Sequence, residues 1–435
     1  AAAMGAAFGV AVHDYRSRTG HDFYAAQRQP VVPSALRGEV TQIGRLVDYS
    51  PHTVAAPRSG VPAGGLDPIQ LVTAYDATDV RNEAGTTTQT VVVFEWGPYK
   101  QSDLDAFAKT AGLPRFSPQL FGGTPTGTND SEVETELDVE VVHAIAPNAR
   151  LVIVNANATT GLPFANVGLA IGRLFTQVDQ KFPGAVWSLS IGWGCDRLYT
   201  RADLEPAESA VEKAESHGTS VFDASGDTAG LECKGNQDYS TPPSASDVGV
   251  DAVASLPAIT SVGGTLLSTD AQGNWAAEEA WDDSSLSQGG AGGVSRLEAR
   301  PSWQVAQGIS GLRGAGHRLV PDVSADADPE SGVAIVIDGK PNEGGGTSQA
   351  APIWAGFTVL MDDYLQHHGG HSIGAINPVV YRIAQNAQQP AFHDITLGGD
   401  AVDLTNPGYD LVTGLGSPMV DNLVQDILTL QRSGT

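Results

Sequence analysis

The chain has 435 residues and a hydrophobic content of 41%, enough apolar material for a large core. Fifty Asp and Glu oppose 24 Lys and Arg, so the net charge is −26, which argues against nucleic acid as a partner. The acidity has two open explanations, simple solubility or work in acid, where carboxylates lose their charge. No run of eighteen apolar residues occurs, so the sequence predicts no membrane span.

Residues 1–65 differ from the rest of the chain in their predicted secondary structure and composition. VAVHDY (10–15) predicts a strand, FYAAQ (23–27) a partner strand, and ALRGEVTQIGRLV (35–47) an amphipathic helix. PHTVAAPRSGVPAGG (51–65) is rich in Pro, Gly and Ser without periodicity, which predicts a linker. No signal peptide opens the chain, and its first residues resemble the interior of a longer sequence.

Beyond residue 65, short apolar strands alternate with amphipathic helices. Strands are predicted at 91–96, 150–156, 186–191, 219–225 and 333–338, and helices at 102–112, 134–146, 164–180 and 203–218. This alternation predicts a mostly parallel central sheet covered by helices on both faces, with functional groups at the carboxyl ends of the strands. The glycine-rich segment 284–295 is predicted to be a surface loop, because it lacks the Lys-Ser/Thr of a phosphate-binding loop.

A serine at the start of a helix is the first candidate for chemistry. Three glycines (344–346) precede Thr347 and Ser348, and an apolar helix is predicted to follow. The N–H groups and dipole at a helix start favour negative charge on a reacting oxygen, so Ser348 is a candidate nucleophile. The alternative is that Thr347 or Ser348 only caps the helix.

A serine nucleophile needs a base, and none of the ten histidines stands in a motif typical of one. His143 falls within an apolar helix, where a structural histidine is expected. His367, His368 and His371 follow the end of a helix and are expected at the surface.

Carboxylates are the more suggestive candidates for the base. Glu134 and Asp138 lie four residues apart, so they share one helix face beside an apolar stripe. Two carboxyls in contact raise one pKa and share a proton, which suits a base that works in acid. The other reading is a solvated acidic face with Glu132, Glu136 and Glu140. The stripe consists of Val133, Leu137, Val141 and Ile145.

A third carboxylate, Asp227, follows a predicted strand in VFDASGD, where functional groups of such sheets collect. Its alternative role is that of a turn residue before Thr228.

The two cysteines, Cys195 and Cys233, are too few for a metal cluster. We expect a disulfide bond between them, with two unrelated buried thiols as the alternative.

Eight segments taken together resemble the sedolisin family of serine-carboxyl peptidases, most closely its kumamolisin-like bacterial members. They cover nearly the whole chain in the family's order. The segments are ETELDVE (134–140), ASGD (224–227), SVGGT (261–265), GGVSR (292–296), PDVSADADP (321–329), GGTSQAAP (345–352), FHDIT (392–396) and NPGYDLVTGLGSP (406–418).

The resemblance implies a subtilisin-like α/β fold and a role for each candidate. Ser348 would be the nucleophile, Glu134 its base, Asp138 the group that orients Glu134, and Asp227 a protonated donor in the oxyanion hole. A neutral carboxylic acid can donate a hydrogen bond to an oxyanion, so activity would be confined to acid. Glu95 matches an acidic residue that extends the carboxylate chain.

Further residues follow from the same resemblance. Trp193 is matched with a tryptophan of the carboxylate network, and SLSIGWG (188–194) would pair with the substrate backbone. Residues 1–65 resemble the C-terminal part of the propeptide, so the peptidase domain would span 66–435. The family's single Ca²⁺ would be held by Asp394, Ile395, Asn406, Gly408 and Asp410, through carboxylate and carbonyl oxygens, with Asn406 where relatives commonly have glycine.

The prediction is therefore a secreted serine-type peptidase, a monomer that cleaves protein or peptide substrates and is inhibited by its own propeptide, without nucleic acid or membrane as partner. Two alternatives stay open. A catalytically inactive homologue would only bind peptides, although the four intact candidate residues argue against it. An aspartic-type peptidase is suggested by Asp-Thr-Ala-Gly at 227–230, but that family needs two such motifs on a mostly β fold.

Overall fold

The computed structural model describes residues 2–16, 22–26, 31–36, 65–84, 89–234, 244–283, 288–314, 316–386 and 389–433. Its helices are α1 (Ala2–Phe8), α2 (Pro68–Ala74), α3 (Thr78–Glu83), α4 (Gln101–Ala111), α5 (Asn129–Ile145), α6 (Phe164–Lys181), α7 (Arg201–Ser216), α8 (Thr347–His367), α9 (Ile376–Asn386) and α10 (Val420–Ser433). Its strands are β1 (Val12–Arg16), β2 (Asp22–Ala26), β3 (Thr90–Glu95), β4 (Gln119–Phe121), β5 (Arg150–Asn155), β6 (Val186–Leu189), β7 (Val221–Ala224), β8 (Thr260–Thr269), β9 (Trp275–Ala280), β10 (Asp282–Asp283), β11 (Gln288–Gly289), β12 (Gly293–Ala299), β13 (His317–Val320), β14 (Val323–Asp326), β15 (Ala334–Ile337), β16 (Lys340–Glu343), β17 (Phe392–His393) and β18 (Ser417–Pro418).

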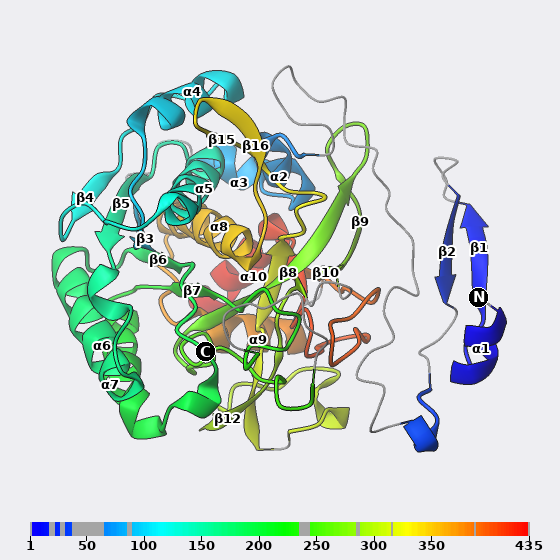
Figure 1. Cartoon of the computed structure of the whole chain (residues 1–435). Coiled ribbons are helices and arrows are strands. Elements are labelled where there is room, and N and C mark those ends of the chain that lie inside the picture. The colour runs from blue at the N-terminus through cyan, green and yellow to red at the C-terminus, as the bar shows by residue number, and fades with distance from the viewer. Residues whose placement is uncertain are drawn as a thin grey trace.

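A central sheet organises the peptidase-like part of the chain. Its strands lie in the order β14-β8-β7-β6-β3-β5-β4, all paired in parallel, and β9 joins β8 antiparallel. Figure 1 shows α6 and α7 on one face of this sheet and α5 and α8 on the other. Strands β3 and β5 are Val- and Ile-rich and buried on both faces, as expected for parallel strands between helical layers.

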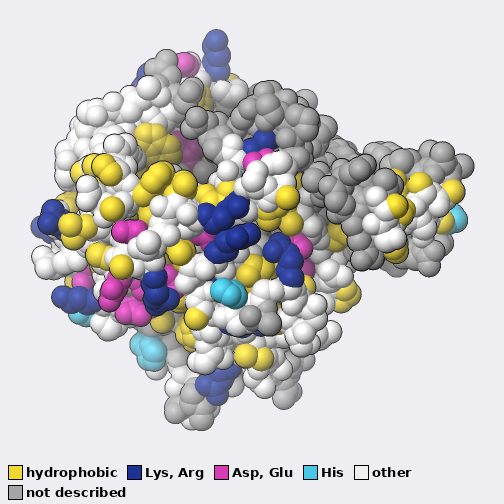
Figure 2. Space-filling model, turned by 60° about the horizontal axis from the view of Figure 1, so that its bottom comes forward, with side chains coloured by type: hydrophobic (Ala, Val, Ile, Leu, Met, Phe, Trp, Pro, Cys, Tyr) yellow, Lys and Arg dark blue, Asp and Glu magenta, His cyan; other side chains and the backbone are white. Residues whose placement is uncertain are grey.

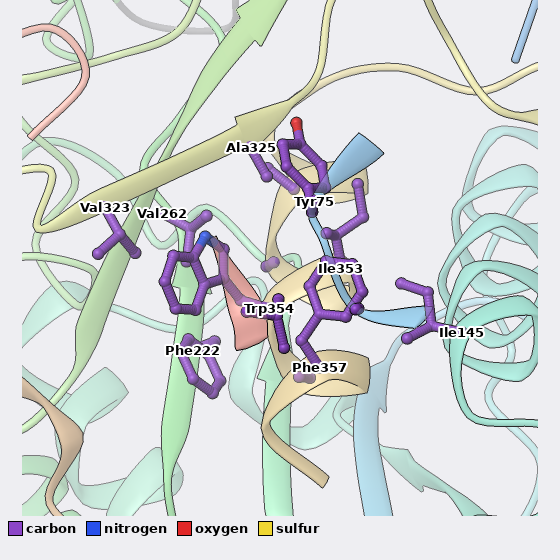
Figure 3. Close-up of a cluster of buried hydrophobic side chains, with 14 of the residues drawn as sticks. Tyr75, Ile145, Phe222, Val262, Val323, Ala325, Ile353, Trp354 and Phe357 are labelled. Atoms are coloured by element: carbon purple, nitrogen blue, oxygen red, sulfur yellow. The ribbon is translucent and has the colours of Figure 1, made fainter. Parts of the chain in front are cut away.

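Helix α8 runs through the larger part of the core (Figure 3). Trp354 stacks on Phe222 of β7 with ring centroids 6.0 Å apart, and Phe357 meets Tyr75 edge to face at 5.9 Å. The indole of Trp354 also donates to the Ser324 carbonyl at 2.9 Å. Replacing Trp354 with alanine would cost about 3–5 kcal/mol, so these contacts hold the start of α8 firmly at the sheet edge.

Two sequence predictions need correction. The apolar strand predicted at 333–338 is β15, which pairs with β16 in a two-stranded hairpin instead of joining the central sheet. It is apolar because it packs against α4 and α5. The central sheet instead includes β8 and β14, which the sequence analysis did not predict. Their sequences contain too many Gly, Ser and Asp residues to be recognised as strands.

The glycine-rich segment 284–295 is also not the surface loop that the sequence predicted, as far as the structure describes it. Residues 289–293 are buried, while 284–287 lie outside the described residues. A Cβ at Gly290 would come within 2.8 Å of the Gly264 nitrogen, so glycine is required for close backbone approach. The Gly289 and Ala291 N–H groups donate to the carbonyls of Asp227 and Gly226 at 3.0 and 2.9 Å. This segment therefore supports the loop that carries Asp227.

The N-terminal strands pair as predicted. β1 and β2 form an antiparallel hairpin with Val12 opposite Ala26, and Figure 1 places it with α1 beside the main body. Residues 34–36 form a short 3₁₀ helix, and the rest of the helix predicted at 35–47 lies outside the described residues, as do residues 51–64 of the predicted linker.

The surface charge is unevenly distributed over the molecule. Figure 2, which brings the lower side of Figure 1 forward, shows basic side chains gathered near the centre of this face and acidic side chains beside them. In the described part of the chain, no helix combines the length and apolar character needed to cross a membrane.

Candidate active site

Ser348 is the second residue of α8, directly after the helix starts at the carboxyl edge of the sheet. The N-cap is Gly346, whose φ of +82° favours glycine. The Thr347 N–H donates to Asp227 and the Gln349 N–H to the Gly346 carbonyl at 2.9 Å. Among the described residues, the Ser348 N–H has no acceptor, so it is available to a bound anion. The predicted position of Ser348 at a helix start is therefore correct.

Pro352 alters the first turn of this helix. Proline has no N–H, so the Ser348 carbonyl lacks its usual helical donor. It accepts instead from the Ser190 hydroxyl at 3.3 Å, just beyond the end of β6. The same hydroxyl lies 2.8 Å from Asp138 Oδ2. Ser190 thus links the nucleophile's backbone to the carboxyl groups of α5.

Helix α5 presents Glu134 and Asp138 to this site. The Ser348 hydroxyl faces the Glu134 carboxyl, and its hydrogen-bonding interaction partly lowers the pKa of Glu134, which burial raises. Burial raises the pKa of Glu134 well above its usual range, the nearby Asp138 raises it further, and the bond from Ser348 offsets part of this. Glu134 is therefore placed to accept a proton from Ser348, and its raised pKa favours the protonated form in acid.

Glu95, at the end of β3, extends the carboxyl chain. Its Oε2 accepts from the Thr135 hydroxyl at 3.1 Å, and Asp138 Oδ2 is taken by Ser190. The two remaining oxygens are buried without another donor, and the Glu95 and Asp138 carboxyls are hydrogen-bonded to each other. Such a bond requires a shared proton. Burial raises the pKa of Glu95 to about 8, with the charge of Glu134 adding to the effect, so this proton stays in place throughout the acid range.

Asp227 lies three residues beyond β7. Its Oδ1 accepts from both the backbone N–H and the hydroxyl of Thr347, each at 2.8 Å. Burial raises the pKa of Asp227, and the two bonds from Thr347 lower it in part. Its other oxygen, Oδ2, has no donor among the described residues, which leaves it free to act as an O–H donor when protonated.

The second acidic face of α5 is not solvated. Glu136 and Glu140 are fully buried, so the reading of a solvated face was wrong for them. Glu136 accepts from the Lys100 N–H and Glu140 from the Val336 N–H, both at 2.8 Å. The reason is that α4 and β15, distant in sequence, pack over this face. Val133, predicted in the apolar stripe, is instead 39% exposed.

Histidine is absent from the described site. His143 is buried, its Nε2 lies 2.8 Å from the Pro114 carbonyl, and its ring stacks on Phe116 at 3.8 Å. Burial lowers the pKa of His143 to about 4, so the ring is neutral over most of the pH range and its role is structural. His367, His368 and His371 are exposed as predicted, but His367 is the last residue of α8, and only His368 and His371 follow the helix end.

The residues after β6 do not follow the prediction in one respect. The Trp193 indole donates to the Thr159 hydroxyl at 3.4 Å, and the structure does not bring it to the carboxyl groups. It braces the segment 190–194 instead.

Cys195 and Cys233 form a disulfide bond with their Cα atoms 4.7 Å apart. This bond joins the end of that segment to the loop that carries Asp227.

The residues matched with a Ca²⁺ site lie together near the C-terminus. Asp410 is fully buried and accepts from the Asn406 N–H at 3.0 Å, while Asp394 accepts from the Gly408 N–H at 3.0 Å. The segment 406–408 thus bridges the two carboxylates. Burial raises the pKa of Asp410 to about 7, and no salt bridge to it occurs in the described part of the chain. Its oxygens accept from backbone N–H groups, and a buried carboxylate of this kind without a basic partner is a type of ligand that fits a hard divalent cation.

Comparison with known proteins identifies the family. The chain is 32% identical over 382 residues to kumamolisin of Bacillus sp. (strain MN-32), with 83% of this chain and 63% of that protein aligned. It is 28% identical to sedolisin of Pseudomonas sp. (strain 101), over 87% of this chain and 64% of that protein. Its fold matches a solved structure of Pseudomonas sedolisin, a serine-carboxyl proteinase, with a TM-score of 0.71 and 25% identity over 87% of this chain and all of that one. The chain belongs to the sedolisin family.

This match confirms the predicted subtilisin-like α/β fold of the sedolisin family. The chain spans about two thirds of the length of the first two curated relatives. No family model matches the chain.

Sequence reasoning missed three hydroxyl groups that hold the sedolisin-type carboxyls. Thr135 contacts Glu95, Ser190 contacts Asp138, and Thr347 contacts Asp227. Two of them adjoin predicted catalytic residues in the sequence, which is a usable signal. Ser190 has no such neighbour, and only the parallel packing of β6 beside β3 brings it to the site.

Proposed function

We propose that the protein is an acid-acting serine-carboxyl peptidase that cleaves protein or peptide substrates through an acyl-enzyme. The observation that carries this proposal is that the Ser190 hydroxyl joins the Ser348 carbonyl, at 3.3 Å, to Asp138, at 2.8 Å, so the row of acids Glu134, Asp138 and Glu95 lies against Ser348. Carboxyl groups in contact share protons, so one of them can be ionised in acid, where a histidine base would be charged and ineffective.

The proposed acylation step uses this row directly. Ser348 Oγ bonds to the carbonyl carbon of the scissile peptide while its proton passes to ionised Glu134. Collapse of the tetrahedral intermediate breaks the C–N bond, and Glu134 returns the proton to the leaving amine. Water then attacks the ester and gives its proton to Glu134, and Glu134 passes that proton to Ser348 Oγ as the ester C–O bond breaks and the carboxylic acid is released. Asp138, bonded to protonated Glu95, orients Glu134 and shares its charge.

Two donors are positioned for the developing oxyanion. One is the Ser348 N–H at the start of α8, where the helix dipole favours negative charge. The other is the protonated Asp227 through Oδ2. Loss of the Asp227 proton would remove a donor and add a repelling charge, so the proposed activity falls on the alkaline side.

The segment after β6 is proposed to bind the substrate backbone. β6 lies between β3 and β7, but its pairings end at Leu189, and the next residues continue toward Trp193 as unpaired chain. Gly192 is exposed, and Asp251 accepts from the Gly194 N–H at 2.9 Å, which holds the segment's far end. An extended peptide can add to such an edge through main-chain hydrogen bonds.

We further propose one Ca²⁺ in the C-terminal loop, held by the carboxylates of Asp394 and Asp410 and by the carbonyl oxygens of Ile395, Asn406 and Gly408. The support is the buried Asp410 without a basic partner and its proximity to the 406–408 backbone. A bound cation would stabilise the loop and take no part in the reaction.

Residues 1–65 are proposed to be the C-terminal part of a propeptide that inhibits the domain formed by 66–435. The hairpin of β1 and β2 forms a sheet of its own, consistent with a separate unit. The disulfide bond between Cys195 and Cys233 supports a secreted protein, because such bonds persist outside the cytosol. We propose that the mature enzyme is a monomer.

The proposal is tested by incubating the protein in acid with a peptide aldehyde, followed by mass spectrometry and a peptide-cleavage assay. A hemiacetal on Ser348 together with cleavage supports the function, with Ser348→Ala as the control that lacks both. Aldehyde binding without cleavage at any pH would favour the inactive, peptide-binding alternative.

A further inference from the structure

Thr347, the residue before the proposed nucleophile, contacts Asp227 twice. Its N–H and its hydroxyl both donate to Asp227 Oδ1 at 2.8 Å. The hydroxyl oxygen accepts from the Gly226 N–H at 3.1 Å, so its single proton is directed at Asp227. Thr347 is 1% exposed, which keeps water from replacing these bonds. The two oxygens of Asp227 are therefore not equivalent.

The other oxygen, Oδ2, lies close to the backbone of Gly346. A Cβ at Gly346 would come within 2.8 Å of Asp227 Oδ2, so the glycine before Thr347 keeps room beside this oxygen. The charged groups that face Asp227 are acids, Glu134 across the site and Glu232 within its own loop. They disfavour an additional negative charge, and neither donates to Oδ2 in the part of the chain that the structure describes.

We propose that Thr347 is a positioning residue that determines which oxygen of Asp227 carries the acidic proton. A proton on Oδ1 would point at two donors, so the neutral carboxyl places it on Oδ2, the oxygen next to Gly346. This inference rests on the proposed peptidase function and deepens it. The hydroxyl of Thr347 also stabilises ionised Asp227, so it helps to set the pH at which the oxyanion donor is lost.

The main test is Thr347→Val, which removes the hydroxyl and keeps the N–H and the side-chain shape. We expect kcat at the acid optimum to fall on the order of tenfold, with KM nearly unchanged, because only the Thr347 N–H then disfavours a proton on Oδ1. The alkaline limb of the pH–rate profile should move to higher pH, because the lost hydrogen bond had lowered the pKa of Asp227. Simple structural damage would lower kcat without that upward movement.

Three variants make the result specific. Thr347→Ser retains the hydroxyl and should restore both kcat and the limb. Thr358→Val removes a buried hydroxyl without a hydrogen-bond partner from the same helix and should leave the pH profile unchanged. In an Asp227→Asn background, Thr347→Val should no longer move the limb, because residue 227 cannot ionise.

The outcomes separate this inference from the proposed function. If the wild-type protein cleaves peptides and adds an aldehyde at Ser348, but Thr347→Val has the wild-type kcat and alkaline limb, the inference alone is wrong. A limb that moves equally in the Asp227→Asn background also overturns it. If the wild-type protein does neither reaction at any pH, the proposed function and the inference fail together.

Discussion

The two acidic faces of α5 are both buried, yet their carboxyl groups contact different partners. Glu134 and Asp138 meet side-chain groups that can exchange a proton, namely Ser348 and Glu95. Glu136 and Glu140 accept from backbone N–H groups of other elements. Burial alone therefore does not mark a catalytic carboxyl, and the kind of partner separates the reacting face from the packing face.

The packing face has its own buried group of acids. Asp103 of α4 accepts from the Gly339 N–H at 3.0 Å, and one oxygen each of Asp103, Glu136 and Glu140 is buried without a partner. Burial raises the pKa of Glu136 to about 7 and that of Glu140 well above its usual range. Both faces thus hold protons in acid, one for chemistry and one for packing.

The largest expected difference is in turnover. Glu134→Gln removes the base and should lower kcat by about 10⁴-fold or more, close to the loss in Ser348→Ala, since the residues act as a unit. Glu136→Gln, two residues away on the packing face, should leave most of kcat at the acid optimum. Steady-state kinetics at that pH measure both. An inactive Glu136→Gln beside an active Glu134→Gln would reverse the assignment of the faces.

The next effect concerns Asp227, whose proposed role is to donate a hydrogen bond to the oxyanion through Oδ2. Asp227→Asn keeps a donor but removes the ionisation, so it should retain part of the activity and extend it to higher pH. The pH–rate profile of the variant against wild type measures this. An unchanged alkaline limb would remove Asp227 from the oxyanion hole.

Calcium gives a smaller effect, on stability. Asp410, like the packing face, accepts from backbone N–H groups, but it is proposed to be neutralised by a cation instead of a proton. Chelation at about pH 5 should lower the melting temperature, because an ion that binds only the folded state stabilises it. Asp410→Asn should lower it similarly and make it insensitive to chelator. A chelator-independent melting temperature in wild type, with no Ca²⁺ by metal analysis, would refute the site.

The smallest expected effect is on the pH dependence of stability, and it concerns Glu136 on the packing face. The pKa of Glu136 is raised by burial from 4.5 to about 7, so its contribution to stability is lost as pH rises through that interval. Glu136→Gln keeps an oxygen for the Lys100 N–H and cannot ionise. At pH 4 its unfolding free energy should match wild type, whereas at pH 7 it should exceed wild type by about 1–3 kcal/mol. Equal curves at both pH values would show that Glu136 ionises freely.

The sequence indicated the proposed reacting face because the signals for it are local. The i, i+4 spacing of Glu134 and Asp138, the glycines before Ser348 and the strand before Asp227 all lie within short segments. The roles of these residues, in contrast, came from the family resemblance. The burial of Glu136 and Glu140 was not predictable, because Lys100 and Val336 reach α5 from distant segments. The same holds for residues 289–293, where glycine allows two backbones to approach and only the fold reveals which.

The central claim is that a protonated carboxyl and an ionised carboxyl work together at Ser348. The most direct test is the rate of cleavage of an unfolded protein substrate from about pH 2 to about pH 9, with Ser348→Ala subtracted and circular dichroism recorded at each pH. We expect a bell-shaped profile in acid, whose alkaline limb falls while the protein is still folded. A rate that rises with pH to a neutral or alkaline plateau would contradict the carboxyl mechanism.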